Sequence, residues 1–243
     1  MLNHKKFLVA NWKMTVTSRQ GIGLLETLLQ VPFHQDNTRI IIAPSFVSIG
    51  LIHDWILKNQ LPIELSAQNC AYQDKGALTG EVSVEMLKEI GCHYVIIGHS
   101  ERRSLFHEKE PELSMKVHLA LQAGLIPILC IGESLEAFKA GETTSILSHQ
   151  LSPYHRDLPM ILAYEPIWSI GTGIIPTKET LQKAIDHIKG LFPDTPLLYG
   201  GSVNHDNIKS LSEHSLLSGF LVGGASSKSE TFLPLIQFMN QTD

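Results

Sequence analysis

The sequence has few cysteines, no long apolar segment and no run of like charges. Its three cysteines, Cys70, Cys92 and Cys130, are widely spaced and lack a C-x-x-C pair, which argues against a disulfide framework or a structural zinc site and favours a reducing compartment. No stretch approaches the roughly 20 apolar residues of a membrane helix, and the apolar run at residues 7–10 is too short for a signal-peptide core. We therefore expect a cytoplasmic protein without a membrane partner.

The charges are dispersed and nearly balanced. The 243 residues include 19 basic and 24 acidic side chains, which gives a formal net charge of -5. This balance disfavours a nucleic-acid partner or an anionic-membrane surface, although it leaves room for a local anion site. Because 43% of the residues are hydrophobic and no linker or low-complexity segment interrupts them, we expect one domain over residues 1–243.

Short apolar runs recur along the whole chain, separated by turn residues and segments of helical periodicity. Most runs are continuously apolar, which is typical of strands buried on both faces of a parallel sheet. Eight such units of roughly 30 residues predict an α/β fold, the (β/α)8 barrel. A doubly wound open sheet is the alternative, but eight near-equal units favour closure. The expected strands cover residues 7–10, 40–43, 63–67, 94–97, 126–130, 160–164, 197–199 and 219–222.

Between the strands, apolar residues at helical spacing predict helices that face the core. The helix expected over residues 134–150 is less clearly defined, because its apolar positions are irregular. The expected buried faces are Leu25, Leu28 and Leu29; Ile49, Ile52 and Ile56; Leu113, Val117, Ala120 and Leu121; Leu181, Ala184, Ile185 and Ile188; and Phe232, Leu235 and Ile236.

The stretch after the sixth expected strand carries the strongest functional signal. Glu165 precedes Pro166, which keeps it out of the α region and therefore extended at the strand's end. Gly171 and Gly173 follow, and glycines permit unusual backbone angles and a close approach to a ligand. A carboxylate on a rigid strand end beneath a mobile loop is the arrangement of a general base under a lid.

Other strand ends add complementary chemistry. The last three strands each lead into glycines, whose bare N–H groups can bind phosphate after strands 7 and 8 of a barrel. Lys13, two residues beyond the first strand, would oppose the phosphate and the charge of an enolate-like transition state. His99 begins a turn into a helix, where the positive end of the dipole favours a neutral imidazole. Together with Glu165, these groups suit proton abstraction next to a carbonyl, with an enediolate intermediate.

Distinctive motifs recur over nearly the whole chain, most of them at the expected strand ends. They are Asn11-Trp12-Lys13-Met14, Thr79-Gly80-Glu81, Ile97-Gly98-His99-Ser100-Glu101-Arg102-Arg103, Cys130-Ile131-Gly132-Glu133, residues 163–173, Tyr199-Gly200-Gly201-Ser202-Val203 and residues 220–226. In this order they resemble the motifs of the triosephosphate isomerases. The resemblance implies a TIM barrel, a homodimer, and cofactor-free and metal-free interconversion of D-glyceraldehyde 3-phosphate and dihydroxyacetone phosphate, as in glycolysis and gluconeogenesis.

The same resemblance implies roles for individual residues. Glu165 would be the base and His99 the electrophile, which shuttles or donates protons to the substrate oxygens. The loop at residues 68–80 would plug into the partner subunit, with Thr79 reaching the partner subunit's Asn11. Asn11 and Lys13 would hold the substrate, and its phosphate would be bound by Gly171, Ser202, Gly223 and Gly224. Glu101 would contact the residues that touch the substrate without touching it itself, and Cys130 would pack near the base.

Three positions depart from the family's usual pattern. Ile174-Ile175-Pro176 replaces a segment that commonly holds a lysine or other polar residue followed by a small pair, and Pro176 fixes φ and lacks an N–H. We expect altered lid kinetics without loss of the chemistry. Ser218 and Thr15 stand where aspartate and asparagine are common, which affects local hydrogen bonding only.

Two alternatives belong to different functional classes. Another phosphate-binding barrel, such as a ribulose-phosphate epimerase or an indole-glycerol-phosphate synthase, would need metal ligands or a second catalytic lysine at the strand ends, and the sequence shows neither there. A catalytically silent barrel retained for binding or surface adhesion is disfavoured by the intact glutamate, histidine and lysine, which do not exclude a second role.

Overall fold

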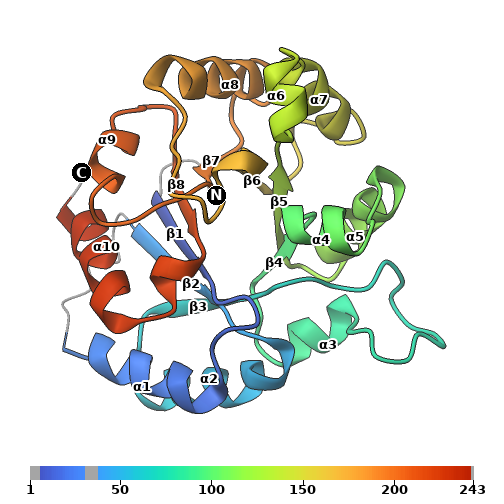
Figure 1. Ribbon diagram of the computed structural model, residues 1–243. Helices are drawn as coiled ribbons and strands as arrows, with labels where there is room; N and C mark the ends of the chain where they lie inside the picture. The colour runs from blue at the N-terminus through green and yellow to red at the C-terminus, as the bar shows by residue number, and fades with distance from the viewer. Residues whose placement is uncertain (1–5, 31–37, 242–243) are drawn as a thin grey trace.

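The computed structural model describes residues 6–30 and 38–241. In this part of the chain, eight parallel strands hydrogen-bond in sequence order and close a barrel, as predicted (Figure 1). The expected domain limits, residues 1 and 243, and the first residues of the N-terminal segment lie outside the described residues. The strands are β1 (Lys6–Asn11), β2 (Thr38–Ala43), β3 (Ile63–Ala67), β4 (Tyr94–Ile97), β5 (Ile126–Ile131), β6 (Ile161–Tyr164), β7 (Leu197–Tyr199) and β8 (Gly219–Val222).

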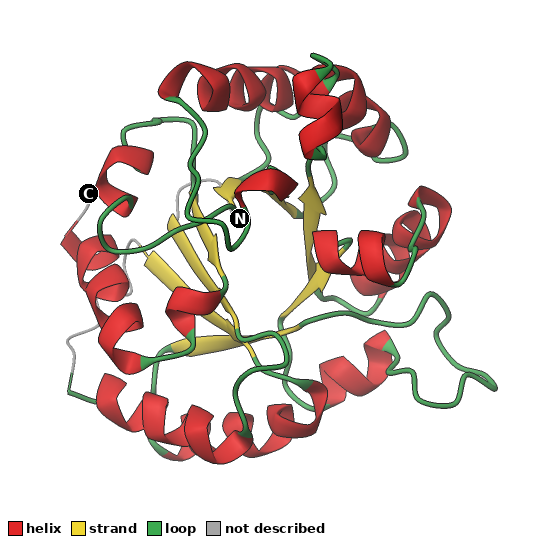
Figure 2. Ribbon diagram, in the orientation of Figure 1, coloured by secondary structure: helices red, strands yellow, loops and turns green. Residues whose placement is uncertain are grey.

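Helices surround the barrel on its outside (Figure 2). They are α1 (Ser18–Leu28), α2 (Phe46–Lys58), α3 (Val84–Glu89), α4 (Ser100–Leu105), α5 (Glu110–Gln122), α6 (Leu135–Lys139), α7 (Thr143–Leu151), α8 (Lys178–Leu191), α9 (Ile208–Leu211) and α10 (Ser229–Gln241), with 3-10 turns η1 (Ile167–Ser169) and η2 (Gly224–Ser226).

The strands are buried on both faces, which explains their continuous apolar runs. On β1, Phe7 and Val9 pack into the barrel interior, whereas Leu8 and Ala10 pack against the surrounding helices. Successive side chains of a strand point to opposite faces, so every position of the run meets a core. The interior cluster also contains Ile41, Ala43, Tyr94, Ile96, Ile128, Cys130, Ile161, Ala163, Leu198 and Leu221.

The helix predictions hold with two corrections. α1 ends at Leu28 and buries Leu24 and Leu25, while Leu29 is 47% exposed, so its assignment to the buried face was wrong. The ill-defined helix at residues 134–150 is two helices, α6 and α7, because Gly141 takes a left-handed φ of 74° between them. Of the other expected faces, only Leu121 is partly rather than fully buried.

The barrel closes where the first and last strands meet. Phe7 N–H donates to Ser218 O over 2.8 Å, and the indole Nε1–H of Trp12 donates to Ser226 O over 3.0 Å. A Cβ on Gly219 would lie 1.9 Å from Phe7 O, so this seam requires a glycine. The segment between β3 and α3 instead projects away from the barrel as a long loop (Figure 1).

Candidate active site

The carboxyl ends of the strands surround a pocket of about 260 Å³. Asn11 and Lys13 come from the end of β1, His99 follows β4, and Glu165 follows β6. Gly171, Ser202, Gly223 and Gly224, all predicted to bind phosphate, also line the pocket. The closed barrel therefore gathers eight of the predicted site residues at one rim.

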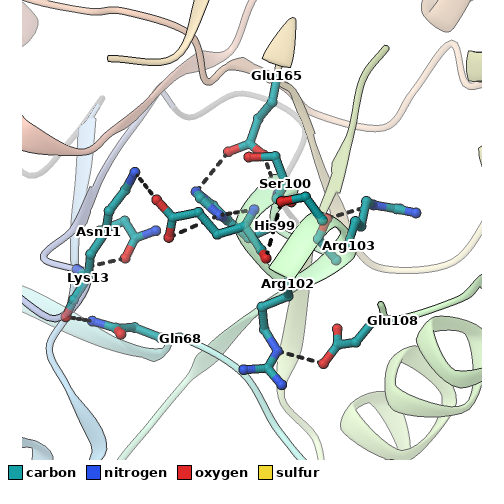
Figure 3. Close-up of polar contacts among 12 residues, drawn as sticks. Asn11, Lys13, Gln68, His99, Ser100, Arg102, Arg103, Glu108 and Glu165 are labelled. Carbon is teal, nitrogen blue, oxygen red and sulfur yellow. Dashed lines mark hydrogen bonds and ion pairs between the residues drawn. The ribbon is translucent and has the colours of Figure 1, made fainter. Parts of the chain in front are cut away.

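Glu165 is the buried carboxylate of this pocket, with only 2% of its surface exposed. Its Oε1 lies 3.3 Å from His99 Nε2, and its Oε2 accepts the backbone N–H of Ser100 over 3.1 Å (Figure 3). The structure thus holds the carboxylate against both the imidazole and the first residue of α4.

His99 stands at the N-cap of α4, where its side chain caps the helix. Its Nδ1 accepts the backbone N–H of Glu101 over 3.2 Å. A ring nitrogen that accepts a hydrogen bond cannot also carry a proton, so a neutral imidazole has its proton on Nε2, facing Glu165. Nε2–H can then donate to a substrate oxygen that enters the pocket.

Lys13 is held in a left-handed backbone conformation, with a φ of 49°. Its N–H donates to Asn11 Oδ1 over 3.1 Å, and its carbonyl accepts from Gln68 Nε2 over 2.8 Å. Its ammonium lies 2.6 Å from Glu101 Oε1. Non-glycine residues adopt this conformation rarely and at a cost, so the flanking hydrogen bonds fix the cation at the pocket's edge.

Glycines let the backbone approach this site closely. A Cβ on Gly223 would lie 3.2 Å from Lys13 Cε, and a Cβ on Gly200 would lie 2.8 Å from Glu165 Cγ. Gly224 opens the 3-10 turn η2 after β8. The lysine and the glycine-rich segments after β7 and β8 therefore face the same space, which suits a phosphate group.

Cys130 and Glu101 do not line the pocket, but each interacts with a residue that does, Cys130 with Glu165 and Glu101 with Lys13. Cys130 lies in the barrel interior, and burial, together with the Glu165 charge, raises the pKa of its thiol. Arg103 ties β4 to β5 by donating to Gly98 O over 2.7 Å and to Cys130 O over 3.0 Å. Thr79, by contrast, is exposed on the projecting loop and does not line the pocket.

The 3-10 turn η1 is anchored to the segment that follows β5, a contact that the sequence did not predict. Trp168 Nε1–H donates to Glu133 Oε1 over 3.0 Å, and the Tyr164 hydroxyl lies 3.2 Å from both oxygens of Glu133. Burial raises the pKa of the Glu133 carboxyl. Phe138 of α6 stacks on Trp168 with ring centroids 4.6 Å apart. The position of Glu133 two residues after β5, within the Cys130-Ile131-Gly132-Glu133 motif, was the signal that could have suggested its role.

The site's groups define a limited chemistry. A carboxylate beside an imidazole can move a proton between neighbouring carbon and oxygen atoms, while a fixed ammonium stabilises a developing negative charge. Among the residues that the structure describes, no three His, Cys, Asp or Glu side chains gather as a metal-ion site. Within the same residues, no helix combines the length and the apolar character needed to cross a bilayer.

Comparison with known proteins identifies the family. The family model described as Triosephosphate isomerase matches residues 6–239. The chain belongs to the triosephosphate isomerase family. Among its relatives, the triosephosphate isomerase of Chlamydia trachomatis serovar L2 is 43% identical, with 96% of this chain and 89% of the relative covered.

Two further triosephosphate isomerases cover nearly the whole of both sequences. The enzyme of Dehalococcoides mccartyi strain CBDB1 is 42% identical over 94% of each chain. That of Mesomycoplasma hyopneumoniae is 42% identical, with 94% of this chain and 97% of the relative covered. These likenesses extend across the barrel and its site rather than over one segment.

Proposed function

We propose that this chain interconverts D-glyceraldehyde 3-phosphate and dihydroxyacetone phosphate without a cofactor, as a triosephosphate isomerase of central carbon metabolism. Its family membership supports the reaction. The observation that carries the assignment of roles is the 3.3 Å separation between Glu165 Oε1 and His99 Nε2 in a pocket that Lys13 also lines.

In this proposal, Glu165 removes a proton from C1 of dihydroxyacetone phosphate. The C1–H electrons form the C1–C2 double bond, and the carbonyl electrons move onto O2 as an enediolate. His99 Nε2–H donates to O2 and exchanges protons between O1 and O2, while Glu165 returns its proton to C2. Lys13 and Asn11 hold the substrate and oppose the charge of the enediolate.

The phosphate is proposed to lie against Gly171, Ser202, Gly223 and Gly224. Backbone amides and the cation of Lys13 line the same pocket and can bind it. Glu101 positions Lys13 through their ion pair. Cys130 packs in the barrel interior close to the proposed base.

The decisive experiment is a coupled isomerase assay of the purified protein beside Glu165→Gln. This change keeps the shape of the side chain and removes the base, so we expect kcat to fall by about a thousandfold or more, which corresponds to about 4 kcal/mol of barrier. Glu26→Gln, an exposed site on α1, serves as the matched control. Equal rates for the wild type and Glu165→Gln would remove Glu165 from its proposed role.

A homodimer is the second part of the proposal, with the loop at residues 68–80 seated in the partner subunit and Thr79 near the partner subunit's Asn11. Large apolar side chains support it, because Met14 is 96%, Val47 92% and Phe106 63% exposed on segments that follow β1, β2 and β4. Burial of such side chains favours association.

Light scattering after gel filtration tests this proposal. We expect the mass of a dimer for the wild type and a shift toward the monomer for Thr79→Arg, with Ser152→Arg on an exposed turn as the control. A monomeric wild type would contradict the dimer.

We further propose that the chain is one domain, since its described strands close a single barrel. We also propose that it acts in the cytoplasm, since Cys70, Cys92 and Cys130 are buried and unpaired.

A further inference from the structure

Ser169 is an unusual member of the lid. It ends the 3-10 turn η1 and is fully buried, with 0% exposure. The lid residues that follow it at 171–175 are exposed. A polar side chain buried at the root of an exposed loop must find its hydrogen-bond partners inside the protein.

The Ser169 hydroxyl uses its whole hydrogen-bonding capacity. Its single hydrogen is donated to Ile174 O over 2.6 Å, at the far end of the lid. Its oxygen must therefore accept from the Tyr199 hydroxyl, 3.0 Å away at the end of β7. Burial raises the pKa of Tyr199 to about 12, which keeps that hydroxyl a donor. The N–H of Ser202 approaches the same oxygen at 3.5 Å.

The backbone of Ser169 extends the network to the proposed phosphate segment. Its carbonyl accepts from Ser202 Oγ over 2.7 Å, and Ser202 Oγ in turn accepts the N–H of Gly173 over 3.3 Å. A Cβ on Gly201 would lie 2.2 Å from the Tyr199 hydroxyl and 2.8 Å from Ser169 Oγ. The glycine between Tyr199 and Ser202 thus leaves the space in which the two hydroxyls meet.

The proline at the far hinge of the lid makes the attachment of the lid depend more on Ser169. Pro176 has no N–H, so the backbone at that position cannot donate a hydrogen bond toward β7. Thr172 Oγ1 contacts Trp168 O at 3.1 Å within the lid itself, whereas the Ser202 contacts and the Trp168–Glu133 contact attach the lid at other points. The Ser169 hydroxyl joins both ends of the lid to Tyr199.

We propose that Ser169 is a positioning residue whose hydroxyl holds the lid against the Tyr199–Ser202 segment, so that Gly171 and the phosphate-binding backbone face one ligand. The proposal rests on the proposed isomerase function for its kinetic consequence but not for its structural one. Loss of the hydroxyl leaves the lid intact and loosens its attachment.

Hydrogen exchange of the lid amides at residues 170–175 tests the attachment without any substrate. Removal of one buried hydrogen bond should raise the population of the detached lid by up to about tenfold in Ser169→Ala. Ser66→Ala is the matched control, since Ser66 is also 0% exposed and its hydroxyl donates to a backbone carbonyl, that of Ala67 on β3. It should leave lid exchange unchanged.

Tyr199→Phe removes the partner hydroxyl and provides a second, independent variant. Because both substitutions break the same contact, the double variant should exchange no faster than the faster single variant. In the isomerase assay, Ser169→Ala should raise KM more than it lowers kcat, whereas a purely structural serine would lower thermal stability and leave KM unchanged.

The outcomes separate the two proposals. A wild type that lacks isomerase activity would overturn the proposed function, while the exchange measurements would still report on Ser169. Lid exchange in Ser169→Ala and Tyr199→Phe equal to that of the wild type would overturn the role of Ser169, whatever the activity.

Discussion

Gly132→Ala tests how tightly the barrel positions Glu165. A Cβ at residue 132 would lie 1.8 Å from the Glu165 carbonyl oxygen and 2.6 Å from its carbonyl carbon. Both are backbone atoms, so no rotamer change relieves the overlap. Ordinary contact requires about 3.5 Å, and the two backbones must therefore separate by more than about 1 Å.

Gly132 cannot easily retreat. The buried Gln150 side chain accepts the Gly132 N–H over 2.8 Å and donates to the Gly132 carbonyl over 3.0 Å. The overlap should therefore displace Glu165, whose carbonyl group faces the new methyl group. A misplacement of about 1 Å costs roughly a hundredfold in rate, and overpacking costs about 1–3 kcal/mol of stability. Each kcal/mol lowers Tm by roughly 2–4 °C in a chain of this size.

The control is Gly124→Ala, far from the pocket. Gly124 has a φ of 73°, and a Cβ there would have Lys88 Nζ, at 3.9 Å, as its nearest neighbour. The left-handed conformation costs a non-glycine residue about 1–2 kcal/mol, so the two variants should lose similar stability. Only Gly132→Ala should lose kcat in the coupled assay. Equal kcat values for the two variants would refute the reasoning.

Three other expectations concern pH and the lid. Burial lowers the pKa of His214, whose Nδ1 lies 2.7 Å from Gln182 Oε1. As the pH falls, the unfolded chain therefore binds the proton before the folded chain does, and the free energy of unfolding should decrease below about pH 6.5. Urea unfolding should show a smaller decrease in His214→Gln. Phe138→Leu removes the ring stacked on Trp168, a contact that stabilises by about 0.5–1.5 kcal/mol. The motion of the hinge at Trp168 should become several-fold faster in ¹⁹F NMR of protein labelled with fluorotryptophan. Unchanged motion would exclude the stack as a hinge contact. Pro176→Ala frees φ at the far hinge, so relaxation dispersion should show faster lid exchange with the chemistry retained.

The barrel was predictable because strands that are buried on both faces have continuous runs of apolar residues. Phe7, Leu8, Val9 and Ala10 are all apolar since each meets either the barrel interior or the helix layer. The helix pattern was less complete. Apolar spacing alone did not show that α1 ends before Leu29, where the chain has begun to turn away from the core.

The site was predictable to the extent that strand ends meet at one rim. Glu165 and His99 are distant in sequence, but parallel strands in a closed barrel bring their carboxyl ends together. Contacts that depend on side-chain conformation could not be predicted in this way, because they correspond to no recurring pattern in the sequence. The Ser169 network depends on how the segment after β6 meets β7, and the hydrogen bonds between Gln150 and Gly132 depend on how α7 packs against β5.

The pairing of β1 with β8 has a consequence for the growing polypeptide. Gly223 and Gly224, which line the pocket together with Asn11 and Lys13, are synthesised more than 200 residues after them. The hydrogen bond between Trp12 Nε1–H and Ser226 O likewise forms only after Ser226 has been synthesised. Contacts of such long sequence separation form late and slowly. A nascent chain that has not yet reached Gly223 and Gly224 therefore lacks part of the pocket, so the site is assembled only after β8 has been made.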